Sequence, residues 1–204
     1  MTMHHHPTRS FLLATASMFA VITLAGCHRA PPVTGDFSGI ALPQHSLAAA
    51  HLDVYLHFTT AASQAWFARE QELASRFGTR LVIAPHFALA AGESDAPMRL
   101  YLLAKDQGKD GEVASALMSA GLPADDPDKT LVLCAFLASR FGLRSAFDDS
   151  TNDAAMHARL AAVIQQTQQQ LQYEPTLILN HQMMLGGDMR NAQAIISAAL
   201  KPAG

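Results

Sequence analysis

The sequence predicts an α/β fold in which a strand–helix–strand unit and a final strand–strand–helix unit are separated by an inserted helical block. Three observations predict it. Apolar residues alternate over residues 51–58, recur with helical spacing over 63–77, and form a run over 79–87. The pattern then stays helical from about residue 94 to 150 and returns to short apolar runs only at 175–185. A chain of 204 residues, 50% of them hydrophobic, can bury the core of one domain with such an insertion.

Residues 1–26 are predicted to be a signal peptide of the lipoprotein type. Arg9 precedes an apolar run from Phe11 to Ala25, which is short for a membrane span and typical of a signal-peptide core. The run ends in Leu24-Ala25-Gly26-Cys27, which resembles the bacterial lipobox, so Cys27 is the expected lipid-attachment residue. The alternative is an ordinary exported protein with a chance cysteine. The histidines at 4–6 belong to the leader and are not interpreted as a metal site.

Residues 27–50 are predicted to be a tether, with a short edge strand around 37–42, because Pro and Gly recur there. Residues 51–92 form the first half of the main domain. Residues 51–58 predict a strand, 63–77 a helix that stops at Gly78, and 79–87 a second strand. A connection of this length implies that the two strands are parallel. The near-continuous apolar run of the second strand predicts that it is buried on both faces.

Residues 93–150 are predicted to form an inserted helical subdomain. Its first helix has a candidate cap at Ser94 or Asp95 and stops at Gly108, a shorter helix follows, and a third begins with Asp126 as cap and Pro127 as first helical residue. The third helix carries Cys134. If Cys27 is lipidated, Cys134 has no partner in the chain, and it is interpreted as a buried apolar residue in preference to a reactive thiol.

Residues 151–204 are predicted to complete the domain. A helix is expected over about 152–172, and residues 175–185 split into two strands around a tight turn at Asn180-His181. Residues 189–200 predict a closing helix. The face of the long helix that is expected to turn toward the core consists of Met156, Leu160, Val163, Thr167 and Leu171.

Three segments in this order resemble the DsbA-type thiol:disulfide oxidoreductases. They are HFTTAASQAWF at the first strand–helix junction, RLYLLAKDQG in the helical block, and YEPTLILNHQMML before the last hairpin. The resemblance implies a thioredoxin-like fold with an inserted helical subdomain. It also places Pro175 where the family has a cis-proline, and it makes Glu174, Pro175 and Thr176 the peptide-groove segment.

The resemblance fails at the family's chemistry. Thr60, Ala61, Ala62 and Ser63 fall on the Cys-Pro-His-Cys positions, so both cysteines are missing. Disulfide exchange needs a thiolate to attack and a second thiol to resolve the mixed disulfide, so no catalytic residue is predicted.

The polar residues around this junction are interpreted as structural. Thr59, Thr60 and Ser63 are expected to cap the helix, since a nucleophilic hydroxyl would need a nearby base such as one of the histidines at 57, 86 and 181. No short His spacing indicates a metal site, and no cofactor is expected. Glu174 would raise the pKa of a neighbouring thiolate, which fits a site no longer used for thiol chemistry; its alternative role is a solvated helix end.

The favoured function is therefore a redox-inactive envelope lipoprotein that binds a peptide or protein partner in the groove and is not an enzyme. The alternatives are a hydroxyl-based glutathione-dependent transferase or isomerase of the kappa-class type using Thr60, a structural component of an envelope assembly, and a thiol–disulfide exchange accessory protein. The net charge of −3 without a basic stripe excludes nucleic acid as a favoured partner. The lipid anchor would hold the protein on the periplasmic side of a bacterial membrane, and His28 after Cys27 favours the outer membrane over the inner.

Overall fold

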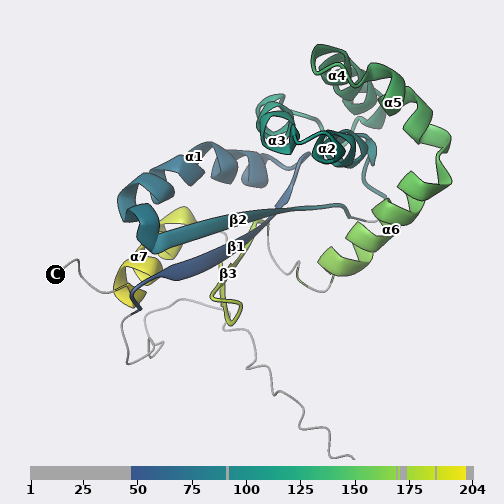
Figure 1. Cartoon of the computed structure of the whole chain (residues 1–204). Helices are drawn as coiled ribbons and strands as arrows, with labels where there is room; N and C mark the ends of the chain where they lie inside the picture. The colour runs from purple at the N-terminus through teal and green to yellow at the C-terminus, as the bar shows by residue number, and fades with distance from the viewer. Residues whose placement is uncertain (1–46, 91, 169, 171–173, 187, 201–204) are drawn as a thin grey trace, which may run out of the picture.

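The computed structural model describes residues 47–200 apart from positions 91, 169, 171–173 and 187 (Figure 1). The predicted signal peptide, the lipobox with Cys27 and the predicted strand at 37–42 lie outside the described residues. Among the helices that the structure describes, none is both long and apolar enough to cross a membrane.

A four-stranded sheet forms the centre of the fold, in the order β2-β1-β3-β4. Strand β1 (Ala50–His57) runs parallel to β2 (Leu81–Ala88) and antiparallel to β3 (Thr176–Leu179), which pairs with β4 (Met183–Leu185). The parallel first pair and the antiparallel hairpin confirm the predicted strand–helix–strand and strand–strand–helix units. Leu52, Val54 and Leu56 alternate along β1 and are fully buried, so one face of this strand belongs to the core.

Helix α1 (Ala61–Phe77) makes the crossover between β1 and β2 and packs against both. Its buried residues include Trp66, Leu73 and Phe77. Gly78 ends the helix with a φ of +55°, a conformation that is easy only for glycine, as the predicted stop requires. A short 3₁₀ turn (Gly78–Arg80) then leads into β2.

The prediction that the second strand is buried on both faces is wrong. Within the described part of the chain, β2 lies at the edge of the sheet and pairs with β1 alone. Val82 is consequently 53% exposed, and burial along β2 is limited to its first residue, Leu81, and its last two, Phe87 and Ala88. Pro85 fits this position, because proline has no N–H to donate and is tolerated on edge strands.

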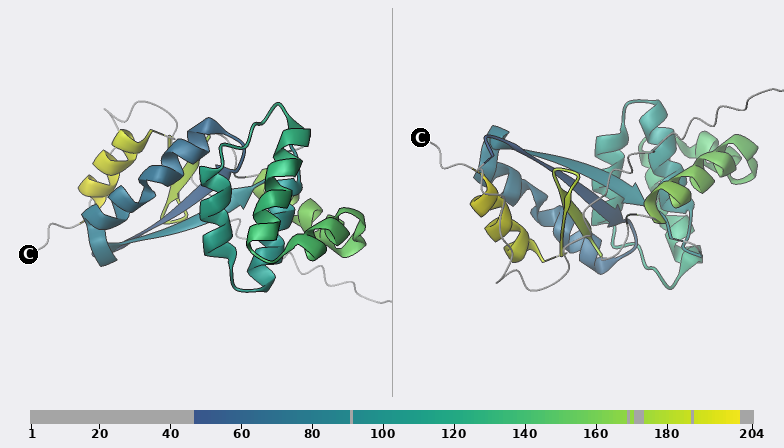
Figure 2. Two further views of the ribbon diagram at one scale, coloured as in Figure 1. Left: turned by 90° about the horizontal axis from the view of Figure 1, so that it is seen from above. Right: turned by 90° about the horizontal axis from the view of Figure 1, so that it is seen from below.

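Five helices form the predicted insertion and the beginning of the second half: α2 (Ala96–Asp106), α3 (Asp110–Ser119), α4 (Pro127–Arg140), α5 (Arg144–Asp149) and α6 (Ala154–Gln168). Figure 1 shows them gathered at the end of the sheet toward which β1 and β2 run. In Figure 2, α7 (Met189–Ala199) lies at the other end beside α1, which runs along the sheet and also contacts α3. The separate short helix α5, followed by a 3₁₀ turn (Ser150–Asn152), was not distinguished in the sequence.

A buried arginine joins the start of α2 to the end of α5. Arg99 is 3% exposed and donates to Asp95, Ser150 and Thr151, with its guanidinium 4.8 Å from the ring centre of Phe147. Asp95 precedes α2 as predicted, but its carboxylate accepts from Arg99 and makes no capping bond. The predicted cap of α4 is confirmed, since Asp126 accepts from the backbone N–H of Lys129.

Cys134 is fully buried in α4, which confirms its interpretation as a core residue. Burial raises the pKa of its thiol to about 12, only partly opposed by the charge of Arg99. We therefore expect no measurable alkylation of Cys134 in the folded protein at pH 8 within an hour, and complete reaction in denaturant, because the thiolate is the reacting species. Mass spectrometry after iodoacetamide treatment measures both. Rapid labelling of the native protein would contradict the buried position.

Candidate functional site

The candidate site lies where β1 ends and α1 begins. Thr60 is the N-cap of α1, with extended backbone angles, and its Oγ1 accepts from the N–H of Ser63 at 3.4 Å. The hydroxyl oxygen of Ser63, which is fully buried, accepts from the backbone N–H of His57 at 3.0 Å. The predicted capping role is confirmed for Thr60 alone. It is wrong for Ser63, whose hydroxyl oxygen binds the end of β1, and for Thr59, whose hydroxyl donates to Glu93. Ala61 and Ala62, between Thr60 and Ser63, are exposed.

A buried ion pair lies directly beneath this junction. His57 is 3% exposed, and its Nδ1 lies 3.0 Å from Oε2 of Glu93, which follows β2. Glu93 is held in turn by the hydroxyl of Thr59, which donates to Oε1, and by the backbone N–H of Ala90, which donates to Oε2 at 2.9 Å. The carboxylate therefore joins the ends of the two parallel strands.

The surroundings of the pair favour its ionised form. Burial acts most strongly on His57 and on its own would lower the pKa, but the hydrogen bond and charge of Glu93 and the charge of Glu174 raise it above 6.5. For Glu93, burial on its own would raise the pKa, but the hydrogen bonds from His57, Thr59 and Ala90 and the charge of His57 lower it below 4.5. At a pH between the folded-state pKa of Glu93 and that of His57, a positively charged imidazolium faces a negatively charged carboxylate.

A second carboxylate approaches the same imidazole from the groove segment. Oε1 of Glu174 lies 4.0 Å from Nε2 of His57, and the Glu174 side chain is half exposed. The Glu174–Pro175 peptide bond is cis, as the resemblance implied. Thr176 is fully buried and pairs with Tyr55 of β1, so the segment at 174–176 enters the sheet beside the strand that carries His57. The structure thus joins Glu174 to the capped junction through His57.

The arrangement lacks the geometry of a hydroxyl nucleophile with a base. In the described residues, the polar contacts of the His57 ring are with the carboxylates of Glu93 and Glu174. The hydroxyls of Thr60 and Ser63 are in backbone bonds instead.

The other two candidate bases lie elsewhere. His86 and His181 both contact Asp53, four residues before His57 on β1. The sequence therefore suggested three histidines for this site, and the structure brings only His57 to it, because His86 lies in mid-strand on β2 and His181 in the β3–β4 turn.

Glu93 is the functional residue that sequence reasoning missed. The sequence pattern assigns it to the start of the helical insertion. The signal that could have found it is its place shortly after β2, because the carboxyl ends of adjacent parallel strands meet at one edge of a sheet. His57 lies at that edge, because it is the last residue of β1 and pairs with Ala88, the last residue of β2.

Comparison with known proteins identifies the fold. No family model matches the sequence, and no curated protein matches it either. Solved structures do match. The oxidoreductase DsbA from Xylella fastidiosa superposes with a TM-score of 0.54 at 17% identity, covering 74% of this chain and 83% of that one. A thioredoxin-like oxidoreductase from Silicibacter pomeroyi gives 0.57 at 18%, covering 76% and 88%. Wolbachia pipientis alpha-DsbA1 gives 0.59 at 12%, covering 74% and 86%.

These likenesses show that the chain has the thioredoxin-like fold with an inserted helical subdomain that DsbA-type oxidoreductases have. They confirm the fold that the sequence resemblance implied.

Proposed function

We propose that this chain, with its DsbA-type fold, is a redox-inactive envelope lipoprotein that binds an extended peptide or protein segment beside Glu174, Pro175 and Thr176. The observation that carries the proposal is the state of the junction. Of the hydroxyls that stand in for the two thiols, that of Thr60 caps α1 and that of Ser63 accepts from the N–H of His57, while the Glu174 side chain remains half exposed.

The redox part of the proposal follows from the thiols. The chain has two cysteines, and Cys134 is fully buried inside α4 with its pKa raised to about 12. The other, Cys27, is the expected lipid-attachment residue. A protein without an accessible pair of thiols has no two-electron couple with which to oxidise or reduce a disulfide.

The groove part of the proposal also gives the preferred partner a charge. At pH 7 the carboxylates of Glu93 and Glu174 flank His57 alone, so the groups around the junction carry a negative excess. Since Glu174 is the exposed member, an extended segment with Lys or Arg is favoured over one with Asp or Glu. A charge at the rim of a groove acts mainly on selectivity and association rate.

Peptide binding tests the proposal. Fluorescence anisotropy would compare two labelled peptides with the same apolar residues, one carrying lysines and one glutamates. We expect the lysine peptide to bind about 3- to 5-fold more tightly, a preference of up to roughly 1 kcal/mol. Glu174→Gln should abolish the preference, while Glu112→Gln, an exposed acid on α3, should leave it. Failure to bind either peptide, or an unchanged preference in Glu174→Gln, would contradict the proposed groove.

The anchor is tested separately. We expect Cys27 to be acylated after removal of residues 1–26, because two or more buried acyl chains give stable attachment. Fractionation should place the wild type with membranes and Cys27→Ala in the soluble envelope fraction. A wild type that incorporates no labelled palmitate would overturn the lipoprotein assignment.

Thr60 supports a second candidate function, that of a glutathione-dependent transferase or isomerase. Its side chain is partly exposed at the start of a 17-residue helix, and its capping bond is long. A hydroxyl there could donate to a glutathione thiolate. Retention on glutathione resin that is lost in Thr60→Ala would favour this transferase function over peptide binding.

A further inference from the structure

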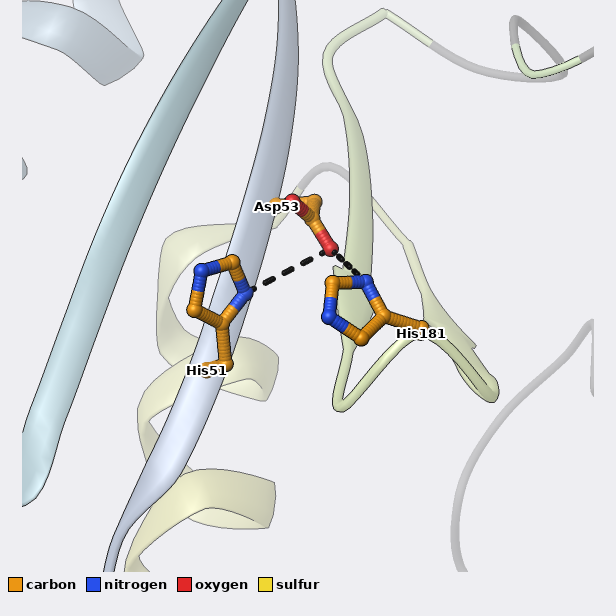
Figure 3. Close-up of side chains that lie close together, drawn as sticks. All are labelled: His51, Asp53 and His181. Carbon is orange, nitrogen blue, oxygen red and sulfur yellow. Dashed lines mark ion pairs between the residues drawn. The ribbon is translucent and has the colours of Figure 1, made fainter.

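A second polar cluster lies in the first half of β1, whose last residue is His57. Figure 3 shows its side chains. The cluster consists of His51 and Asp53 on β1 and His181 in the turn between β3 and β4. Nδ1 of His181 lies 2.6 Å from Oδ2 of Asp53, and Nδ1 of His51 lies 3.5 Å from the same oxygen. One possible ligand atom from each residue lies within 4.8 Å of those of the other two.

The fold positions the three side chains through strand alternation and the hairpin. His51 and Asp53 are two residues apart on a strand and therefore point to the same side of the sheet. Asn180 fixes the turn over them, because its Oδ1 accepts from the N–H of His51 at 2.8 Å and its own N–H donates to the carbonyl of His51 at 2.7 Å. Positive φ angles at Asn180 and His181 then bring the imidazole of His181 against Asp53.

A third histidine, His86, contacts the other oxygen of the Asp53 carboxylate. Nε2 of His86, on β2, lies 2.8 Å from Oδ1 of Asp53, and its ring stacks on Tyr55 with centres 4.8 Å apart. His86 therefore occupies one carboxylate oxygen and leaves Oδ2 directed at His51 and His181. Partners of this kind orient the ligands of metal sites.

Two features of the cluster point to a cation. Asp53 is only 5% exposed, so its charge is largely removed from water. Nδ1 of His51 is buried and faces Oδ2 of Asp53 at 3.5 Å, but within the described part of the chain it makes no hydrogen bond. A buried polar atom without a partner is costly, and a metal ion would satisfy this nitrogen and the Asp53 charge together.

We propose that Nδ1 of His51, Nδ1 of His181 and Oδ2 of Asp53 bind one divalent transition-metal ion. Two imidazoles and one carboxylate are a donor set suited to Zn²⁺ and its neighbours and not to Ca²⁺ or Mg²⁺, which prefer oxygen. Around a tetrahedral ion, ligand atoms at about 2.0–2.2 Å lie roughly 3.4 Å from one another. Small side-chain rotations would lengthen the 2.6 Å contact between His181 and Asp53. They would also shorten the longest separation among the three ligand atoms, which is at most 4.8 Å. His181 is 70% exposed, so an ion can enter from solvent.

The proposed metal site is separate from the groove. Along β1, His51 lies six positions and Asp53 four positions from His57, about 20 and 13 Å on an extended strand. Loss of metal binding would leave the proposed peptide function intact, and the reverse also holds.

Zinc titration tests the proposal, in a background that removes an obvious competitor. The consecutive histidines at 4–6 can bind metals themselves, so the full chain carries His4→Ala, His5→Ala and His6→Ala in every sample. Isothermal titration with ZnCl₂ would compare this background with His181→Ala. His157→Ala is the matched control, since His157 is an exposed histidine on α6.

We expect His181→Ala to lose one equivalent of bound zinc, together with the zinc-dependent rise in Tm. His157→Ala should keep both. His86→Ala should keep the stoichiometry but bind about 10-fold more weakly, as expected for a partner that orients a ligand. With Co²⁺ in place of zinc, visible absorption bands of a low-coordinate ion should appear in the background and vanish in His181→Ala. Equal zinc binding by the background and His181→Ala would overturn the proposal.

Discussion

Replacing Glu93 by alanine is expected to lower the free energy of unfolding by about 3 kcal/mol, the range seen when one partner of a buried ion pair is removed. Three donors lose their acceptor in this variant: Nδ1 of His57, the hydroxyl of Thr59 and the N–H of Ala90. The imidazolium of His57, itself 3% exposed, would be left buried without its hydrogen-bonded partner. Urea unfolding at pH 6, followed by circular dichroism, measures the loss.

Two variants separate the charge from the packing. Glu93→Gln keeps a side-chain oxygen that can accept a hydrogen bond but removes the charge, so its loss should be smaller than that of Glu93→Ala. Glu72→Ala, which removes an exposed acid from α1, should change stability by no more than about 0.5 kcal/mol. A Glu93→Ala variant as stable as Glu72→Ala would show that the pair contributes nothing to the fold.

The same pair should give the stability a pH dependence. The pKa of His57 is raised above 6.5 on folding, so its contribution is full below 6.5 and is lost as pH rises through the folded value. The pKa of Glu93 is lowered below 4.5, so its contribution is full above 4.5 and is lost as pH falls through the folded value. The difference in stability between wild type and Glu93→Gln should therefore be largest between about pH 4.5 and 6.5.

The architecture was predictable because local patterns carried it. Alternation at Leu52, Val54 and Leu56, a glycine stop at Gly78 and an Asn180-His181 turn are each readable within a few residues, and the structure confirms all three. The exposure of β2 was not readable in the same way. An apolar run looks alike on a central and an edge strand, and the distinction depends on which strands later in the chain pair beside it. Pro85 was the local clue.

The sites were less predictable, because their residues meet only through the fold. Glu93 is 36 residues from His57 in the chain, and Glu174 is 117 residues from it, yet both carboxylates face one imidazole. His181 meets Asp53 across 128 residues. No spacing rule for short motifs detects such groups. The resemblance placed Thr60 and Ser63 at a strand–helix junction and a cis peptide bond at Pro175, and the structure has both features, because a family pattern already contains a three-dimensional arrangement.

A gain of function is the sharpest test of whether Thr60 and Ser63 occupy the two thiol positions of the DsbA-type family. The double substitution Thr60→Cys, Ser63→Cys is expected to form an intramolecular disulfide and to turn undetectable insulin reduction into measurable activity. Thr60 and Ser63 are close, with Oγ1 of Thr60 3.4 Å from the N–H of Ser63. Thr60 is partly exposed and Ser63 fully buried, which suits an attacking thiol and a resolving thiol respectively. The N-terminus of α1 would favour a thiolate at position 60.

Glu174 should limit this acquired activity, because a carboxylate near the groove disfavours a thiolate. Adding Glu174→Val to the double variant is therefore expected to raise the turnover rate about 3- to 10-fold and to lower the pKa of the new thiol at position 60. The matched control is Ala62→Cys, Ala65→Cys. These two exposed positions of α1 have the same spacing, and the substitutions leave the N-cap residue Thr60 in place. The control should show no comparable turnover. Insulin reduction by the unmodified protein, or a Thr60→Cys, Ser63→Cys variant whose disulfide does not close under oxidising conditions, would contradict the placement of this junction on the family's thiol site.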